Sequence, residues 1–212
     1  MKWDDFVNTV KDLPIIEVDN LLGGDVLPDD IRVQLSRWQK TGKVVQLRRG
    51  IYLLSPAYRK VAVYEPYLAA CLKRPSYISL EKALEFHNLI PEAVHVFTSI
   101  TTKRPTVFKN ELGVFDYRHI KNALFWGYDS VTINNQTGFM ASAEKALLDL
   151  IYLRQVKVDE AYLEGLRLEN VEKINLDKLL EMAKRFKKPK LVKAAKAIKK
   201  YINLNTSHER VL

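Results

Sequence analysis

Apolar residues spaced three or four positions apart predict three helices in the first forty residues. They are expected over residues 3–10, over 18–22, and from Pro28 to just before Gly42. Pro14 follows the first helix and cannot continue it, and proline at the start with glycine after the end suits the third. The N-terminal region is therefore predicted to be mainly helical.

Two short strand-like runs follow, over residues 44–47 and 51–54, joined at Arg48-Arg49-Gly50. Three helices followed by a hairpin is the element order of a winged helix-turn-helix. The hairpin tip then carries arginines where a wing would meet DNA phosphates. We predict that residues 1–56 form a winged helix-turn-helix DNA-binding domain.

The remaining residues, 57–212, alternate strand-like and helical patterns and predict an α+β domain with a mostly antiparallel sheet and a helical C-terminal region. Ser79 is expected to cap a helix over 80–87, and Ser142 a helix reaching about residue 153. Everything after Asp159 has helical spacing. The expected strands cover residues 94–100, 106–109, 114–118, 124–128 and 130–133, with a loop over 134–138.

Composition excludes several classes of protein. The chain is 47% hydrophobic, which suffices for a buried core, and its single cysteine allows no internal disulfide. The first residues lack the pattern of a signal peptide, and no apolar run approaches the roughly 18 residues of a membrane span. We therefore expect a cytoplasmic protein with no membrane segment.

The net charge of +9 is concentrated in one segment. Residues 182–202 contain nine lysines and arginines and no acidic residue, whereas the rest of the chain has 25 basic and 25 acidic groups. Such a cluster suits a polyanionic partner, usually nucleic acid, and equally a solvated helix face. The sequence leaves both interpretations open.

The third helix has the features of a DNA-recognition helix. With Ile31, Leu35 and Trp38 turned toward a core, arginine and short polar side chains point outward, as major-groove recognition requires. Basic groups around the hairpin would hold phosphates. The alternative is an amphipathic helix with ordinary solvated charges. The predicted DNA-binding residues are Arg32, Val33, Gln34, Ser36, Arg37, Lys40, Lys43, Arg48 and Arg49.

A second basic surface is predicted from residues further along the chain. Its alternatives are a charged turn at a strand end, an Asp116–Arg118 pair, and a solvated helix face. Glu144 and Lys145 at a helix start are expected to be solvent groups, with Asp149 able to pair with Lys145 one turn later. The residues of the second surface are Lys103, Arg104, Arg118, Lys190, Lys193, Lys196 and Lys200.

No sequence signature of catalysis is present. The four histidines lack metal-ligand spacing, and there is no phosphate-cradling glycine loop and no nucleophile elbow. We therefore expect no cofactor, no metal and no enzymatic activity. Two rival functions stay open: an RNA-binding or nucleic-acid-processing enzyme, and an interaction module that binds a toxin directly.

The segment Arg32-Val33-Gln34-Leu35-Ser36-Arg37-Trp38 resembles the N-terminal domain of AbiE-type (AbiEi-like) antitoxins of type IV toxin–antitoxin systems. So do residues 42–43 and 47–52. The resemblance covers about residues 5–155. Similarity to the second domain of the family rests on residues 75–81, 87–92, 98–104, 115–120 and 141–150.

This resemblance implies an abortive-infection antitoxin that represses transcription of its own operon. The partners implied are double-stranded operator DNA and a nucleotidyltransferase-like toxin, which type IV antitoxins oppose without a stable complex. Repressors of this kind often bind paired sites, so a homodimer or cooperative binding is compatible with this scheme. The operator sequence and the target of the toxin cannot be inferred from the chain.

Overall fold

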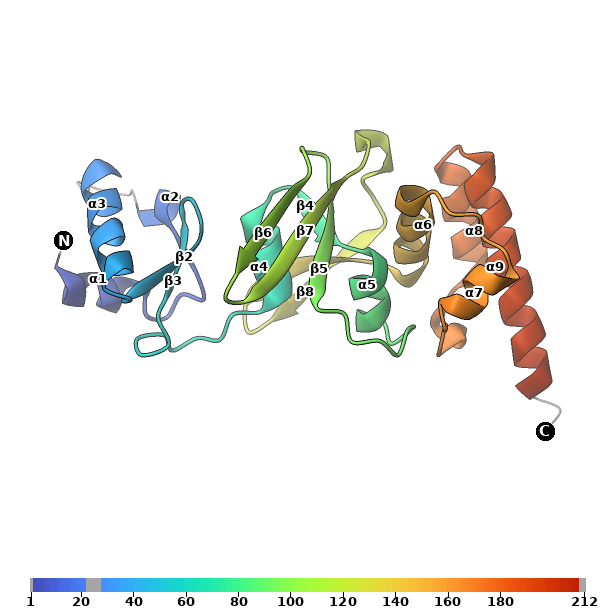
Figure 1. Ribbon diagram of the computed structural model, residues 1–212, viewed down its shortest axis with the longest axis horizontal. Coiled ribbons are helices and arrows are strands. Elements are labelled where there is room, and N and C mark those ends of the chain that lie inside the picture. The colour runs from blue at the N-terminus through green and yellow to red at the C-terminus, as the bar shows by residue number, and fades with distance from the viewer. Residues whose placement is uncertain (1, 22–27, 210–212) are drawn as a thin grey trace.

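The computed structural model describes residues 2–21 and 28–209, with side chains described over 2–21 and 31–204. Along its longest axis, Figure 1 shows a small N-terminal unit at one end, a six-stranded sheet in the middle and the C-terminal helices at the other end. The chain is α+β, as predicted.

The N-terminal unit packs three helices against a three-stranded antiparallel sheet of order β1-β3-β2. Helices at 3–10 and 28–40 and the hairpin confirm the sequence predictions. The short strand β1 was not predicted, because two residues carry no periodicity. The elements are α1 (Trp3–Val10), β1 (Ile16–Glu17), α2 (Val18–Leu21), α3 (Pro28–Lys40), β2 (Val44–Arg48) and β3 (Ile51–Leu54).

The small sheet contributes to two hydrophobic cores. Val44 and Leu54 pack with α1 and α3, whereas Leu47, Ile51 and Leu53 join the core of the larger unit. An ion pair of 2.9 Å between Arg74 and Glu17 also crosses between the units. The predicted boundary at residue 56 falls just after β3, but hydrophobic packing continues across it.

The central sheet is mixed. Its order is β6-β7-β5-β4-β9-β8, and the pairs β4–β9 and β5–β7 are parallel while the other three pairs are antiparallel. The prediction of a mostly antiparallel sheet is therefore confirmed only in part. The strands are β4 (Ser76–Ile78), β5 (Val96–Thr101), β6 (Thr106–Asn110), β7 (Gly113–His119), β8 (Tyr128–Ile133) and β9 (Gln136–Ala141).

One predicted strand and one predicted loop in this region were wrong. The expected strand over 124–128 is a short 3-10 helix, η1 (Asn122–Leu124), and an irregular segment before β8. The expected loop over 134–138 is a turn of two residues in the left-handed region, after which β9 begins at once. The polar Gln136 is accommodated in β9 because its side-chain amide is buried and bonds the backbone of Tyr64 and Ala62 at 2.8 and 2.9 Å.

Helix α4 (Glu65–Leu72) lies against one face of the sheet and was missed by the periodicity analysis (Figure 1). Six of its eight residues are buried, so it has no polar face to mark a helical period. Gly138 allows the close approach of α4 to β9, since a Cβ atom there would lie 2.5 Å from backbone atoms of Pro66. Strand β9 is thus fixed beneath the start of α4.

Helix α6 lies between the sheet and the C-terminal helices (Figure 1). The predicted apolar stripe of the last helix, formed by Leu191, Ala195, Ile198 and Ile202, is buried against the rest of the protein. Within the described ranges, no helix is long and apolar enough to cross a membrane. The helices are α5 (Leu80–Phe86), α6 (Ala143–Arg154), α7 (Glu160–Gly165), η2 (Val171–Lys173), α8 (Leu176–Arg185) and α9 (Pro189–Glu209).

Candidate nucleic-acid interface

Helix α3 has one buried face and one exposed face, as the sequence predicted. Ile31, Leu35 and Trp38 are at most 7% exposed and form the buried face. Gln34 is half-buried at the border. The opposite face exposes the side chains of Arg32, Val33, Ser36, Arg37 and Lys40.

An aromatic cluster holds α3 in place. The Trp38 ring lies 4.5 Å from the Phe6 ring and 5.0 Å from the Trp3 ring, centroid to centroid. Aromatic pairs at such distances contribute beyond their buried area. The outer face of α3 is therefore presented from a packed support on α1.

The path from α3 into the hairpin depends on Gly42. Its φ of +68° lies in the left-handed region, which glycine adopts without the steric cost other residues incur. The backbone amides of Gly42 and Lys43 then donate to the carbonyls of Gln39 and Trp38 at 3.0 and 2.9 Å. This turn brings Lys43 to the junction, where its Nζ lies 4.7 Å above the Trp3 ring.

The two arginines of the hairpin have different environments. Arg49 is exposed at the tip. Arg48 is half-buried, follows an irregularity in the β2–β3 register, and donates from Nη2 to the carbonyl of Cys71 at 3.4 Å. Arg48 thus reaches toward the larger unit, and Arg49 is the arginine that the tip presents to solvent.

A groove of about 460 Å³ lies between the hairpin and the β1–α2 segment, and Arg32 of α3 lines it as well. Arg32, Arg48 and Arg49 line it together with Glu17 and Asp19. Because carboxylates offset the arginines, the groove itself is not strongly positive. The exposed surface of α3 is the more favourable place for an anionic partner.

The predicted second basic surface comes from separate elements. Lys103 and Arg104 are exposed in the turn between β5 and β6, and Arg118 pairs with Asp116 at 2.7 Å, which confirms that predicted pairing. On α9, Lys193, Lys196 and Lys200 are exposed. Lys190 donates from Nζ to the backbone carbonyl of Gln155 at 2.6 Å.

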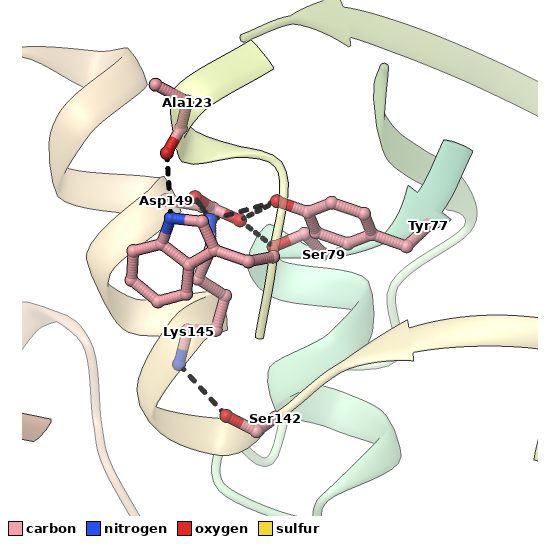
Figure 2. A network of polar contacts seen from close by, with 7 residues as sticks. Tyr77, Ser79, Ala123, Ser142, Lys145 and Asp149 are labelled. Carbon is pink, nitrogen blue, oxygen red and sulfur yellow. Dashed lines mark hydrogen bonds and ion pairs between the residues drawn. The ribbon is translucent and has the colours of Figure 1, made fainter. Parts of the chain in front are cut away.

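A buried polar network joins α6 to the central sheet (Figure 2). Lys145 and Asp149 form an ion pair with neither side chain exposed, and the carboxylate of Asp149 also accepts from the hydroxyls of Tyr77 and Ser79 at 3.0 and 2.9 Å. Lys145 Nζ donates to the Tyr77 hydroxyl at 2.9 Å. Sequence spacing predicted the ion pair, but placed Lys145 in solvent, which was wrong.

The predicted capping role of Ser79 was also wrong. Its hydroxyl makes no cap to α5 and donates to Asp149 instead. Ser142, in contrast, caps α6 as predicted, because its oxygen accepts from the backbone amide of Lys145. The sequence could not distinguish the roles of the two serines, because the partner of Ser79, Asp149, is brought to it only by tertiary packing.

Burial dominates the protonation behaviour of the network. It lowers the pKa of Lys145 and raises the pKa of Asp149, and the attraction between the two charges opposes both shifts. Burial also raises the pKa of the Tyr77 hydroxyl, and the adjacent Asp149 carboxylate raises it further. The network is closed to solvent, which favours a structural role for it.

Glu144 was predicted to be a solvent group and is 4% exposed. Its carboxylate accepts from the backbone amide of Asn175 at 3.0 Å and from the Ser142 hydroxyl at 2.8 Å. It also forms an ion pair with Lys178 at 3.2 Å. Burial raises its pKa, but these bonds outweigh burial and the pKa is lowered overall. Glu144 therefore connects the start of α6 to the start of α8.

Among the described residues, no three histidine, cysteine, aspartate or glutamate side chains gather so as to hold a metal ion. No model of a known protein family matches the chain, and no curated protein sequence matches it either.

Proposed function

We propose that the N-terminal unit binds double-stranded DNA as a winged helix-turn-helix. Helix α3 would enter the major groove, and the β2–β3 hairpin would contact the phosphate backbone. The observation that carries this proposal is that α3 is amphipathic, with one buried apolar face and one exposed polar face. Three buried apolar residues anchor the helix, while Ser36, Arg37 and Lys40 point into solvent.

The exposed side chains suit different parts of that task. The guanidinium of Arg37 can bond a guanine edge at two points, which discriminates between bases. Arg49 at the hairpin tip and Lys40 near the end of α3 suit phosphates, which position a protein without reading sequence. Arg48 is left out of this set, because it reaches to the Cys71 carbonyl.

The element order supports the same proposal. Three helices, a short strand between the first two, and a hairpin beside the third are arranged with the sheet order β1-β3-β2. In this arrangement the outer face of α3 and Arg49 at the hairpin tip are exposed, while Arg48 contacts the larger unit.

The biological role we propose is that of an antitoxin which represses its own operon. The support is the resemblance of residues 5–155 to AbiE-type antitoxins, which implies operator DNA as ligand and a nucleotidyltransferase-like toxin as the protein that is opposed. In that scheme the antitoxin acts without forming a stable complex with the toxin.

Binding to DNA from directly upstream of the gene tests the first part. Arg37→Ala is expected to weaken specific binding by about 1–3 kcal/mol and to relax preference at one base position. Lys60→Ala, which removes an exposed charge on the linker after the hairpin, serves as the matched control. Unchanged binding by an Arg37→Ala/Arg49→Ala double variant would show that α3 and the hairpin are not the DNA-binding surface.

Co-expression tests the second part. The chain should restore growth to cells that express the toxin encoded beside it, and the two proteins should not co-purify. A stoichiometric complex that survives deletion of residues 1–56 would instead identify the chain as a direct toxin-binding module. A neighbouring reading frame unrelated to nucleotidyltransferases would contradict the proposed operon.

A further inference from the structure

A cavity of about 450 Å³ lies where β7 ends, α6 ends and α9 begins. Its lining combines one histidine, two lysines and one glutamine with a few apolar or aromatic side chains. The residues concerned are His119, Tyr152, Gln155, Lys188, Lys190 and Leu191. This cavity lies at the opposite end of the larger unit from α3.

The charged side chains that line this cavity are lysines, and His119 lies beside them. No carboxylate lines it, whereas the groove beside α3 includes Glu17 and Asp19, and a smaller cavity beside α7 includes Asp159 and Glu160. An anion that enters therefore meets cations without the repulsion of a nearby carboxylate. Among the cavities formed by the described residues, this asymmetry favours an anionic ligand here.

The tertiary fold brings together two basic segments that are far apart in sequence. His119 follows Arg118 at the end of β7, and its Nδ1 lies 3.2 Å from the carbonyl of Lys103 in the β5–β6 turn. Lys188 and Lys190 come from the start of α9. Of the predicted second basic surface, Lys190 lines this cavity, where His119 and Lys188 join it.

The cations of the cavity are not equivalent. Lys190 donates to the Gln155 carbonyl and so offsets the negative end of α6. Lys188 is exposed, and within the described residues its side chain makes no hydrogen bond or ion pair. Helix α9 has 21 residues, and its N-terminus, the positive end of the helix dipole, directly follows Lys188.

The apolar wall adds a surface for a base. Tyr152 is half-buried, lines the cavity, and is supported from behind by Phe186, with 5.6 Å between ring centroids. Aromatic rings beside basic residues are the usual means of holding single-stranded nucleic acid, because every base can stack. The cavity combines such a ring with the cationic side chains of Lys188 and Lys190.

A track of lysines leads away from the cavity along α9. Lys193, Lys196 and Lys200 follow Lys190 at steps of three or four residues, so they lie on adjacent turns. The apolar stripe on the opposite face of α9 is buried in the protein and is not available to a membrane; its residues are Leu191, Ala195, Ile198 and Ile202. A nucleic-acid strand can follow exposed lysines without a free apolar face.

We propose that this cavity binds a nucleoside phosphate, with the phosphate at Lys188 and His119 and the base against Tyr152. The ligand is either a free nucleotide or one nucleotide of a single strand that continues along Lys193, Lys196 and Lys200. This site is separate from the DNA interface proposed for α3.

Fluorescence anisotropy with a labelled 12-nucleotide oligo(U) and calorimetry with ATP test the proposal on the full-length protein. His119→Gln/Lys188→Gln should weaken binding about tenfold or more, and Tyr152→Leu should weaken it to a similar extent. Lys60→Gln/Lys109→Gln, which removes two exposed lysines elsewhere, should change binding less than about twofold. Circular dichroism confirms that each variant is folded.

The source of the ligand is decided by the lysine track. If the ligand is a strand, Lys193→Gln/Lys196→Gln/Lys200→Gln should weaken oligo(U) binding and reduce the salt slope by about 2, leaving ATP binding unchanged. If it is a free nucleotide, ATP binds and the track variant behaves as wild type with both probes.

Three results would overturn the proposal. They are no binding of either probe below about 1 mM, full binding by His119→Gln/Lys188→Gln, and binding that Arg37→Ala/Arg49→Ala abolishes. The last of these would assign all nucleic-acid binding to α3. Loss of operator binding in the α3 variants, with intact oligo(U) or ATP binding, would show that the two sites are separate. Intact operator binding in the α3 variants, with oligo(U) or ATP binding that His119→Gln/Lys188→Gln weakens, would refute the DNA interface and support this site.

Discussion

Lys145 and Asp149 form an ion pair one helical turn apart on α6, and neither side chain is exposed to solvent. Removing two charges from water is costly, and here the cost is offset by mutual attraction and by hydroxyl donors from β4 and the residue after it. The pair fixes the position of α6 on the sheet because the donors, Tyr77 and Ser79, lie on the other side of that contact.

Breaking this pair from one side should be strongly destabilising. Lys145→Met keeps the length of the side chain but leaves Asp149 charged and buried, and should lower the free energy of unfolding by about 3–5 kcal/mol. Lys145→Met/Asp149→Leu removes both charges and should cost less than the single substitution. Urea denaturation measures both. A loss below about 1 kcal/mol for Lys145→Met would show that the pair is not closed to water.

Acid should weaken the contact that Glu144 makes with the start of α8. Because its pKa is lowered in the folded state, Glu144 stabilises the fold above its usual pKa of 4.5, and this contribution is lost as pH falls through the lowered value. Glu144→Gln should therefore be less stable than wild type at pH 7, with the difference narrowing below about pH 4.5. Thermal unfolding between pH 3 and 7 measures this. A difference that stays constant with pH would contradict it.

Alanine substitution should have opposite effects at two glycines, one at the contact between α4 and β9 and one in open space. Gly138→Ala forces a Cβ atom against the Pro66 backbone and should destabilise the protein by about 1–3 kcal/mol. Gly165→Ala, at the end of α7, has no neighbouring atom within 4 Å and should be neutral or stabilising by up to about 1 kcal/mol. Melting temperatures of the two variants decide this. Equal effects would show that β9 can move away from α4.

Substitutions of Arg37 and Arg49, two exposed arginines of the proposed DNA interface, should differ in how they change the salt dependence of DNA binding. Arg49→Ala at the hairpin tip should weaken binding to all duplexes alike and reduce the salt slope by about 1. Arg37→Ala should chiefly reduce discrimination between sequences. Titrations at several salt concentrations, with specific and unrelated duplexes, separate these effects. A change in sequence preference on removing Arg49 would place the tip against base edges instead.

Local sequence patterns were sufficient to predict a helix or strand and its buried side wherever one face of the element is exposed to solvent. The buried and exposed faces of α3, the hairpin at 44–54 and the apolar stripe of α9 all follow from the spacing of side chains. Where an element is buried on all sides, that signal is lost, and α4 was missed for this reason. The winged-helix interpretation stays a prediction, as do the domain boundary and the antitoxin function.

The proposed sites differ in how far the sequence could define them. The outward set on α3 could be listed in advance, because a helical period fixes which side chains share a face. Sequence could not show that Arg48 turns to the Cys71 carbonyl, since its partner is 23 positions away. Nor could it show that His119 and Lys188 line the same cavity, because two different elements bring them there.

The sequence by itself determined the class of fold, the order of the helices and the hairpin in the N-terminal unit, and the concentration of charge in residues 182–202. Each of these depends on neighbours along the chain. Tertiary structure decided what each polar group meets. Lys145 and Glu144 are buried, Ser79 donates to Asp149, and Lys188 and Lys190 line a cavity with no carboxylate. Contacts between residues that lie far apart in sequence depend on how the elements pack. The sequence pattern of one segment carries no information about that packing.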